Sequence, residues 1–193
     1  TDFRRVQATE VVNGGQAEGP FSGVGFWEAR LNEGFRIAAI GGSDNHDAAL
    51  DSTKPASVGY PTTVVHAAEL SQPAILAAIR AGHVFVDTQG SRERTLEVTA
   101  TSGGHTAEMG DSLAAPAGAR VRFTVRVTHA AGASLSISGN GPKPKLAAQA
   151  FSDDETLSFE VAGDGRAHWL RMDVRGPDGK LWLLGNPIYL NGR

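Results

Sequence analysis

The sequence IAAIGGSDNHD, residues 37–47, runs from an apolar segment through two glycines to a carboxylate and an imidazole. The apolar run 37–40 predicts a short buried strand, and the two glycines mark the point where that strand ends. Because α/β folds carry their chemistry at the carboxyl ends of parallel strands, Asp44 and His46 are the leading candidates for functional residues. Two interpretations stay open: the pair binds a metal ion, or Asp44 caps the next turn and His46 lies on the surface.

The composition excludes several classes of protein. The chain has 193 residues, of which 40% are hydrophobic and 20% charged, and its net charge is -3. These values are typical of a globular protein and provide no basic surface for nucleic acid or an anionic membrane. The chain has no cysteine, which excludes disulfides and thiolate metal sites but leaves cytoplasmic and exported locations open. No membrane-spanning apolar run and no signal peptide is visible in the sequence.

Residues 1–93 alternate strand-like and helical segments. Strands are predicted at 6–12, 36–41 and 83–87, and helices at 21–35 and 71–82. The second helix has the clearest ends, because Ser71 suits the N-cap, Pro73 the first turn and Gly82 the C-terminal cap. Alternation of strands and helices predicts an α/β fold with parallel strand pairing.

Residues 94–193 form a second predicted domain of a different class. Its short segments alternate apolar and polar residues, as in RVRFTVRVT at 120–128. Asp164-Gly165 and 177–179 (PDG) lie between such segments and predict tight hairpin turns. The segment therefore predicts an antiparallel β-sandwich of the immunoglobulin-like type, and the polar stretch 89–94 is the expected boundary.

A second carboxylate, Glu10, interrupts the apolar strand at 6–12. It faces either solvent or a barrel interior, where it would need a metal or a cation because unpaired burial of a charge is unfavourable. Asn13 ends that strand at the same edge of the predicted sheet at which Ser43 follows the strand at 36–41. Glu10, Asn13 and Ser43 are therefore predicted to lie near the candidate site. The sequence identifies no catalytic residue.

Several segments together resemble the last third of a PHP domain, the polymerase and histidinol phosphatase superfamily of metal-dependent hydrolases. They are EVVNG at 10–14, FWE at 26–28, IGGSDNH at 40–46, GYPTTVV at 59–65, AAIRAGHVFV at 77–86 and GNPIYL at 185–190. The resemblance is to the branch that includes carbaryl hydrolase, in which a β-sandwich follows the PHP domain. It implies that residues 1–93 are the C-terminal part of a distorted (β/α)7 barrel and residues 94–193 the sandwich.

The resemblance also implies a chemistry. Asp44 and His46 match the family's final metal-binding motif, so they are expected to hold zinc, manganese or iron. The substrate would be a small-molecule phosphoester or related ester. The family's opening His-x-His pair and its middle His and Glu ligands have no counterpart in this sequence. A catalytic zinc site usually has three protein ligands. We therefore expect an incomplete hydrolase region, inactive alone, whose metal belongs to the complete protein.

A barrel that lacks its first strands has open edges. We expect these edges to pair with the missing amino-terminal part or with a second copy of the chain. A different hypothesis is a non-catalytic module that binds glycan or protein through Trp169 or Trp182, with Tyr189 beside them, and a third is a structural assembly domain. Exposure of these aromatic residues would favour binding, whereas burial would leave them a packing role.

Overall fold

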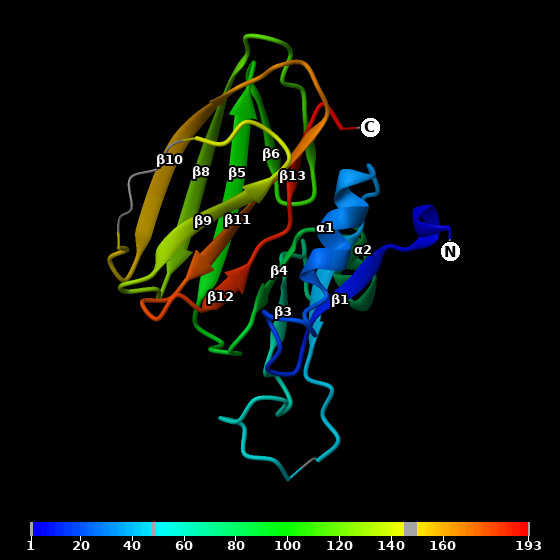
Figure 1. Cartoon of the computed structure of the whole chain (residues 1–193), viewed down its shortest axis with the longest axis vertical. Coiled ribbons are helices and arrows are strands. Elements are labelled where there is room, and N and C mark those ends of the chain that lie inside the picture. The colour runs from blue at the N-terminus through cyan, green and yellow to red at the C-terminus, as the bar shows by residue number, and fades with distance from the viewer. Residues whose placement is uncertain (1, 48, 145–149, 193) are drawn as a thin grey trace. The chain divides into compact units, whose positions relative to one another are not determined.

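The computed structural model describes residues 2–47, 49–144 and 150–192 (Figure 1). The chain divides into two compact units. The first unit comprises the described residues up to Arg92 together with Leu181–Leu184, and the second comprises Glu93–Lys180 and the described residues from Gly185 onward. The first unit is therefore built from two stretches of chain that are far apart in the sequence.

The first unit contains one short 3-10 helix, two α-helices and five strands among its described residues. They are η1 (Phe3–Arg5), β1 (Ala8–Asn13), α1 (Val24–Asn32), β2 (Ala38–Gly42), β3 (Thr62–Val65), α2 (Gln72–Ala81), β4 (Val84–Asp87) and β12 (Leu181–Leu184). β1 and β2 pair in parallel, whereas β4 pairs antiparallel with β3 and with β12.

The prediction of a partial (β/α)7 barrel is wrong. Such a barrel requires parallel strands that alternate with helices. Among the described strands of the first unit only β1 and β2 are parallel, and its two α-helices span 9 and 10 residues. Strands dominate the described chain, and its fold is compatible with an all-β, sandwich-like arrangement.

The connection through α2 explains why β3 and β4 are antiparallel. Ser71 caps the helix by accepting a hydrogen bond from the Ala74 backbone N–H at 3.3 Å, and Gly82 ends it in the left-handed conformation with φ 83°. These predicted caps are confirmed. The left-handed turn leads the chain straight into β4, and the His66 N–H donates to the His83 carbonyl at 2.9 Å. The connection between the two strands thus starts and ends at the same end of the strand pair, and β4 returns beside β3.

A threonine hydroxyl joins β3 to β2. The Thr63 Oγ1 accepts a hydrogen bond from the Gly41 N–H at 2.9 Å and donates to the Gly41 carbonyl at 2.8 Å. One side chain thereby satisfies both backbone groups of a strand residue, which is the role that a neighbouring strand usually plays. The contact fixes β2 against the antiparallel strands of the first unit.

The described strands of the second unit form two groups. They are β5 (Thr95–Ser102), β6 (His105–Glu108), β7 (Ser112–Leu113), β8 (Arg120–Thr128), β9 (Ser134–Gly139), β10 (Glu155–Ala162), β11 (His168–Arg175) and β13 (Ile188–Leu190). One group is an antiparallel sheet in the order β10-β8-β5-β6. In the other, β11 pairs antiparallel with β9 and β13, and β13 pairs in parallel with β7.

The alternation predicted for 120–128 is confirmed in β8. Its apolar residues Val121, Phe123, Val125 and Val127 are all buried, whereas the arginines between them are exposed. Phe123 stacks on Phe159 of β10, with ring centroids 5.3 Å apart. The core of the second unit is therefore built from one face of this sheet, as period-two patterning requires.

The segment around Asp164-Gly165 is not the predicted hairpin turn. It joins β10 to β11, but β10 pairs with β8 while β11 pairs with β9 and β13. The segment therefore carries the chain from one sheet of the second unit to the other. A turn signal of this kind marks a reversal of the chain and does not identify the partners of the flanking strands.

An ion pair is buried on β11. The Arg171 Nε donates to both carboxylate oxygens of Asp173, at 2.9 and 3.0 Å, and its Nη2 donates to the Oδ2 at 2.9 Å. The two side chains are each 3% exposed, and Asp173 also accepts the Gly185 N–H at 3.2 Å. Burial raises the pKa of Asp173, and the neighbouring Arg171 opposes that rise.

Removal of one member of this pair should destabilise the second unit strongly. We expect Arg171→Met or Asp173→Leu alone to lower the free energy of unfolding by about 3–5 kcal/mol, because each leaves a buried charge uncompensated. The double variant Arg171→Met/Asp173→Leu should lose less than either single variant. Urea denaturation followed by circular dichroism would measure all three values, and additive losses would contradict the interpretation.

Replacement of Thr63 should loosen the first unit. We expect Thr63→Val to lower the free energy of unfolding by about 1–3 kcal/mol, because both backbone groups of Gly41 lose their partner. Thr9→Val on β1 is the matched control, since Thr9 is also a half-buried threonine in a strand of the first unit. Its loss should stay within about 0.5 kcal/mol. Equal losses in the two variants, measured by urea denaturation, would show that the Thr63 bridge is not important.

Candidate functional site

The parallel pair β1 and β2 brings the predicted site residues to one edge of the first unit. Asn13 is the register partner of Gly42, and the Gly14 N–H donates to the Gly42 carbonyl at 2.8 Å. The two strands therefore end side by side. Their following residues, which carry the candidate polar groups, leave the pair at the same edge.

The glycines of β2 make this edge possible. A Cβ on Gly41 would lie 2.7 Å from the Val86 Cγ1, too close for any side chain without a shift of β4. A Cβ on Gly42 would collide with the Glu10 Oε1, so the absence of a side chain makes room for that carboxylate. Packing around β2 thus favours glycine at Gly41, while Gly42 leaves the Glu10 carboxylate in its position.

Glu10 is exposed, which agrees with the solvent-facing alternative for this residue. Its Oε2 accepts a hydrogen bond from the Asn13 Nδ2 at 3.3 Å, and its Oε1 lies over Gly42. The carboxylate therefore extends across β2 toward the segment that begins with Ser43. Ser43 itself is half-buried, and its carbonyl oxygen faces the backbone of Gly14.

Asp44 and His46 lie together just beyond the end of β2. The His46 Nε2 is 3.2 Å from the Asp44 Oδ1, and the side chains are 86% and 56% exposed, respectively. Asp44 adopts a left-handed backbone conformation with φ 49°, which bends the chain directly after the strand. The two-residue spacing thus places an oxygen and a nitrogen ligand side by side. In the described residues the Asp44 carboxylate contacts His46 rather than capping a turn.

The chemical type of these ligands fits zinc, manganese or iron, but their number does not complete a catalytic site. Asp44 and His46 supply two ligand atoms, and a catalytic zinc usually has three from protein. Glu10 does not supply the third ligand. Among the described residues, its carboxylate oxygens do not lie within 4.8 Å of the ligand atoms of both Asp44 and His46. We therefore derive no catalytic step from these residues alone.

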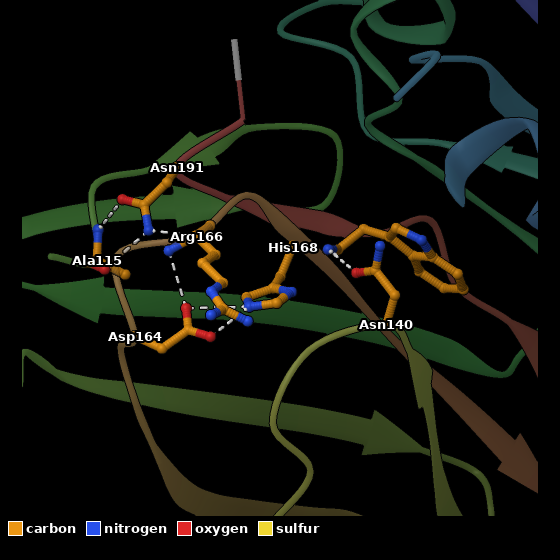
Figure 2. A network of polar contacts seen from close by, with 7 residues as sticks. Ala115, Asn140, Asp164, Arg166, His168 and Asn191 are labelled. Carbon is orange, nitrogen blue, oxygen red and sulfur yellow. Dashed lines mark hydrogen bonds and ion pairs between the residues drawn. The ribbon is translucent and has the colours of Figure 1, made fainter. Parts of the chain in front are cut away.

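A second Asp–His pair lies in the second unit, where sequence reasoning found no ligand spacing (Figure 2). The His168 Nε2 lies 3.0 and 2.9 Å from the two carboxylate oxygens of Asp164, and the Arg166 backbone N–H donates to Asp164 at 2.9 Å. The i,i+4 spacing around Gly165 is the signal that could have indicated the pair. It was missed because such a spacing is a helical signal, and here a turn creates it.

Asparagine side chains anchor the backbone around this pair, as Figure 2 shows. The Asn191 amide donates to the carbonyls of Ala115 and Arg166 at 2.8 and 3.0 Å, and its oxygen accepts the Ala115 N–H at 2.8 Å. The Asn140 Oδ1 accepts the Trp169 N–H at 2.9 Å. These contacts satisfy backbone groups between strands, so the network is explained as a structural one.

The aromatic residues considered for ligand binding are mostly buried. Trp169 is 4% and Tyr189 8% exposed, and Trp182 is half-buried. A side chain stacks on a sugar or a protein ligand only through an accessible ring face. Burial therefore leaves Trp169 and Tyr189 a packing role.

No protein-family model matches this sequence, and no curated protein sequence matches it either. Within the described residues, no helix combines the length and the apolar character needed to cross a membrane.

The Asp164–His168 pair predicts a pH dependence of stability. The hydrogen bond from His168, followed by that from the Arg166 N–H, holds the pKa of the Asp164 carboxyl below its usual value. Because this pKa is lowered on folding, the carboxylate stabilises the fold above about pH 4, where the unfolded group is ionised. That contribution is lost as the pH falls through the folded-state pKa. We expect the stability difference between the natural chain and Asp164→Asn to shrink as the pH falls below about 4.

Urea denaturation over a pH series would measure this difference. A second variant, His168→Leu, removes the side-chain donor while leaving the carboxylate. The pKa of Asp164 in that variant, followed by NMR of the carboxyl carbon, should rise toward its usual value. An unchanged Asp164 titration in His168→Leu would contradict the assigned cause.

Proposed function

We propose that the first unit contributes two ligands, Asp44 and His46, to the divalent-metal site of a metal-dependent hydrolase. The observation that supports this most is the meeting of an aspartate oxygen and a histidine nitrogen, 3.2 Å apart, at the carboxyl end of a parallel strand pair. The resemblance of the same residues to the final metal-binding motif of PHP hydrolases supports the same function. The substrate class is a small-molecule phosphoester or related ester.

Each neighbouring residue has a role in this proposal. A divalent metal, when bound, would supply Lewis acidity for ester hydrolysis. Asp44 would provide an anionic oxygen and His46 a neutral nitrogen, which suit zinc, manganese and iron alike. Glu10, held by Asn13 across Gly42, would add negative charge beside the cation. The exposure of Asp44 and His46 leaves them accessible to a metal and to further ligands.

The remaining ligands, in this proposal, come from another polypeptide segment or from a second copy of the chain. Two protein ligands leave most of the coordination sphere of a metal open. We therefore expect weak metal binding and little or no hydrolysis by this chain alone. Once the remaining ligands are supplied, the pair would become part of a closed site.

A non-catalytic binding module remains the alternative class. Its simplest form, an aromatic platform, is not favoured because Trp169 and Tyr189 are buried. A binding surface elsewhere on the chain would not require Asp44 or His46, so metal binding discriminates between the two functions.

Metal titration of matched double variants tests the proposal. Asp44→Ala/His46→Ala should abolish the heat of binding of Zn²⁺ or Mn²⁺ in isothermal titration calorimetry, because both ligand atoms are lost. Asp164→Ala/His168→Ala is the control, since it removes the same residue types from a pair that lies away from parallel strand ends. In the protein that supplies the remaining ligands, the first double variant should also abolish ester hydrolysis. Full activity and an unchanged metal content there would overturn the assignment.

A further inference from the structure

We propose that Asn140 is a site of spontaneous covalent modification, at which the side-chain amide is converted to aspartate or isoaspartate while the protein is folded. The sequence contains three Asn-Gly steps, at 13–14, 140–141 and 191–192. The structure distinguishes them, because it holds their reacting groups to different degrees. The site at 140–141 includes none of the candidate metal ligands, so this proposal is independent of the proposed function.

The Asn-Gly dipeptide suits this reaction because glycine has no side chain to hinder attack by its own nitrogen. The Gly141 backbone nitrogen gives its proton to water or hydroxide and forms a bond to the side-chain carbonyl carbon of Asn140. The bond from that carbon to Nδ2 breaks, and ammonia leaves a five-membered imide. Water then opens the imide at either carbonyl, which yields aspartate or isoaspartate. The reaction therefore needs an accessible side-chain amide and a backbone N–H that no other group holds.

Asn140 meets these requirements at the end of β9. It is an exposed residue, and its Oδ1 accepts the Trp169 N–H at 2.9 Å (Figure 2). Its own N–H donates to the Trp169 carbonyl at 3.3 Å, so the side-chain oxygen takes the place of a backbone carbonyl in the last pair of the β9–β11 ladder. Because successive N–H groups of a strand point to opposite sides, that of Gly141 points away from β11. Among the described residues, no hydrogen bond holds the Asn140 Nδ2 or the Gly141 N–H.

The one hydrogen bond of the Asn140 side chain also favours the reaction. Attack by the Gly141 nitrogen places negative charge on the Asn140 Oδ1, and the Trp169 N–H already donates to that oxygen. A backbone donor in this position stabilises the charge that develops during the attack. The contact therefore assists the chemistry while it leaves the departing nitrogen free of described partners.

The other two Asn-Gly steps are held. The Gly14 N–H donates to the Gly42 carbonyl at 2.8 Å, so the nitrogen that would attack Asn13 is engaged. The Asn191 amide makes three hydrogen bonds, two through its nitrogen and one through its oxygen. Both asparagines are half-buried. Each can react only after local opening of the structure, which lowers its rate in proportion to the population of the open state.

Peptide mapping by mass spectrometry of the folded chain after ageing tests the proposal. The three Asn-Gly steps lie in separate tryptic peptides, because lysine and arginine residues separate them. At neutral to mildly alkaline pH, we expect amide-to-acid conversion at Asn140 to be at least about tenfold faster than at Asn13 or Asn191, which react only through local opening.

The same chain in urea is the control for the flanking sequences. Unfolding releases the hydrogen bonds at all three steps, so conversion at Asn13 and Asn191 should accelerate at least about tenfold and that at Asn140 by much less. Equal rates at the three steps of the folded chain would overturn the proposal. Slowing of Asn140 by folding as strong as that of Asn191 would also overturn it.

Ion-exchange chromatography gives an independent measure, because each conversion makes the net charge of -3 one unit more negative. The natural chain should accumulate an acidic form with time. Asn140→Gln keeps an amide at this position but has a longer side chain that closes a ring less readily, so it should accumulate the acidic form several times more slowly. Circular dichroism would confirm that this variant is folded. An acidic form that grows equally fast in both chains would overturn the assignment to Asn140.

Discussion

The close approach of backbone to side chains at Gly41 and Gly42 is the constraint on which the first unit depends. A side chain at Gly41 would meet the buried Val86 of β4, and one at Gly42 would displace the Glu10 carboxylate from its position. The same close approach lets the Thr63 hydroxyl reach both backbone groups of Gly41. Two residues without Cβ atoms thus connect the parallel strand pair to the antiparallel strands and also open the edge at which Asp44 and His46 emerge.

The second unit depends on a different principle, the alternation of buried and exposed residues along long strands. Several of its polar groups form hydrogen-bonded pairs, such as Arg171 with Asp173 and the Asn191 amide with Ala115. Charges that are paired and hydrogen-bonded in this way can be buried without loss of the fold. The first unit, by contrast, carries Asp44 and His46 just beyond the end of β2, where both side chains are mostly exposed.

Local features of the fold were predictable from the sequence, whereas strand partners were not. The caps of α2 at Ser71 and Gly82 and the buried face of β8 follow from short-range patterns, and these predictions are confirmed. The pairing of β4 with β12 joins residues nearly a hundred positions apart, and no periodicity reports such a contact. The same limit applies to the site. The two-residue spacing indicated that Asp44 and His46 could turn toward one metal ion, whereas it gave no sign of their direct contact or of the position of Glu10 beside a register shift in β1.

The return of Leu181–Leu184 to the first unit has a consequence for the order of events during synthesis. β4 is synthesised long before its partner strand β12. The hydrogen bond from the Thr88 hydroxyl to the Leu181 carbonyl can likewise form only after β12 is made. At bacterial and eukaryotic elongation rates this interval is on the order of 5–20 s. Throughout it the nascent chain lacks the partner strand of β4, and all four strands of the other sheet, β5, β6, β8 and β10, are completed before β12 is made. That sheet of the second unit can therefore form before the first unit receives its last strand, β12. The first unit begins earlier in the sequence but is completed later.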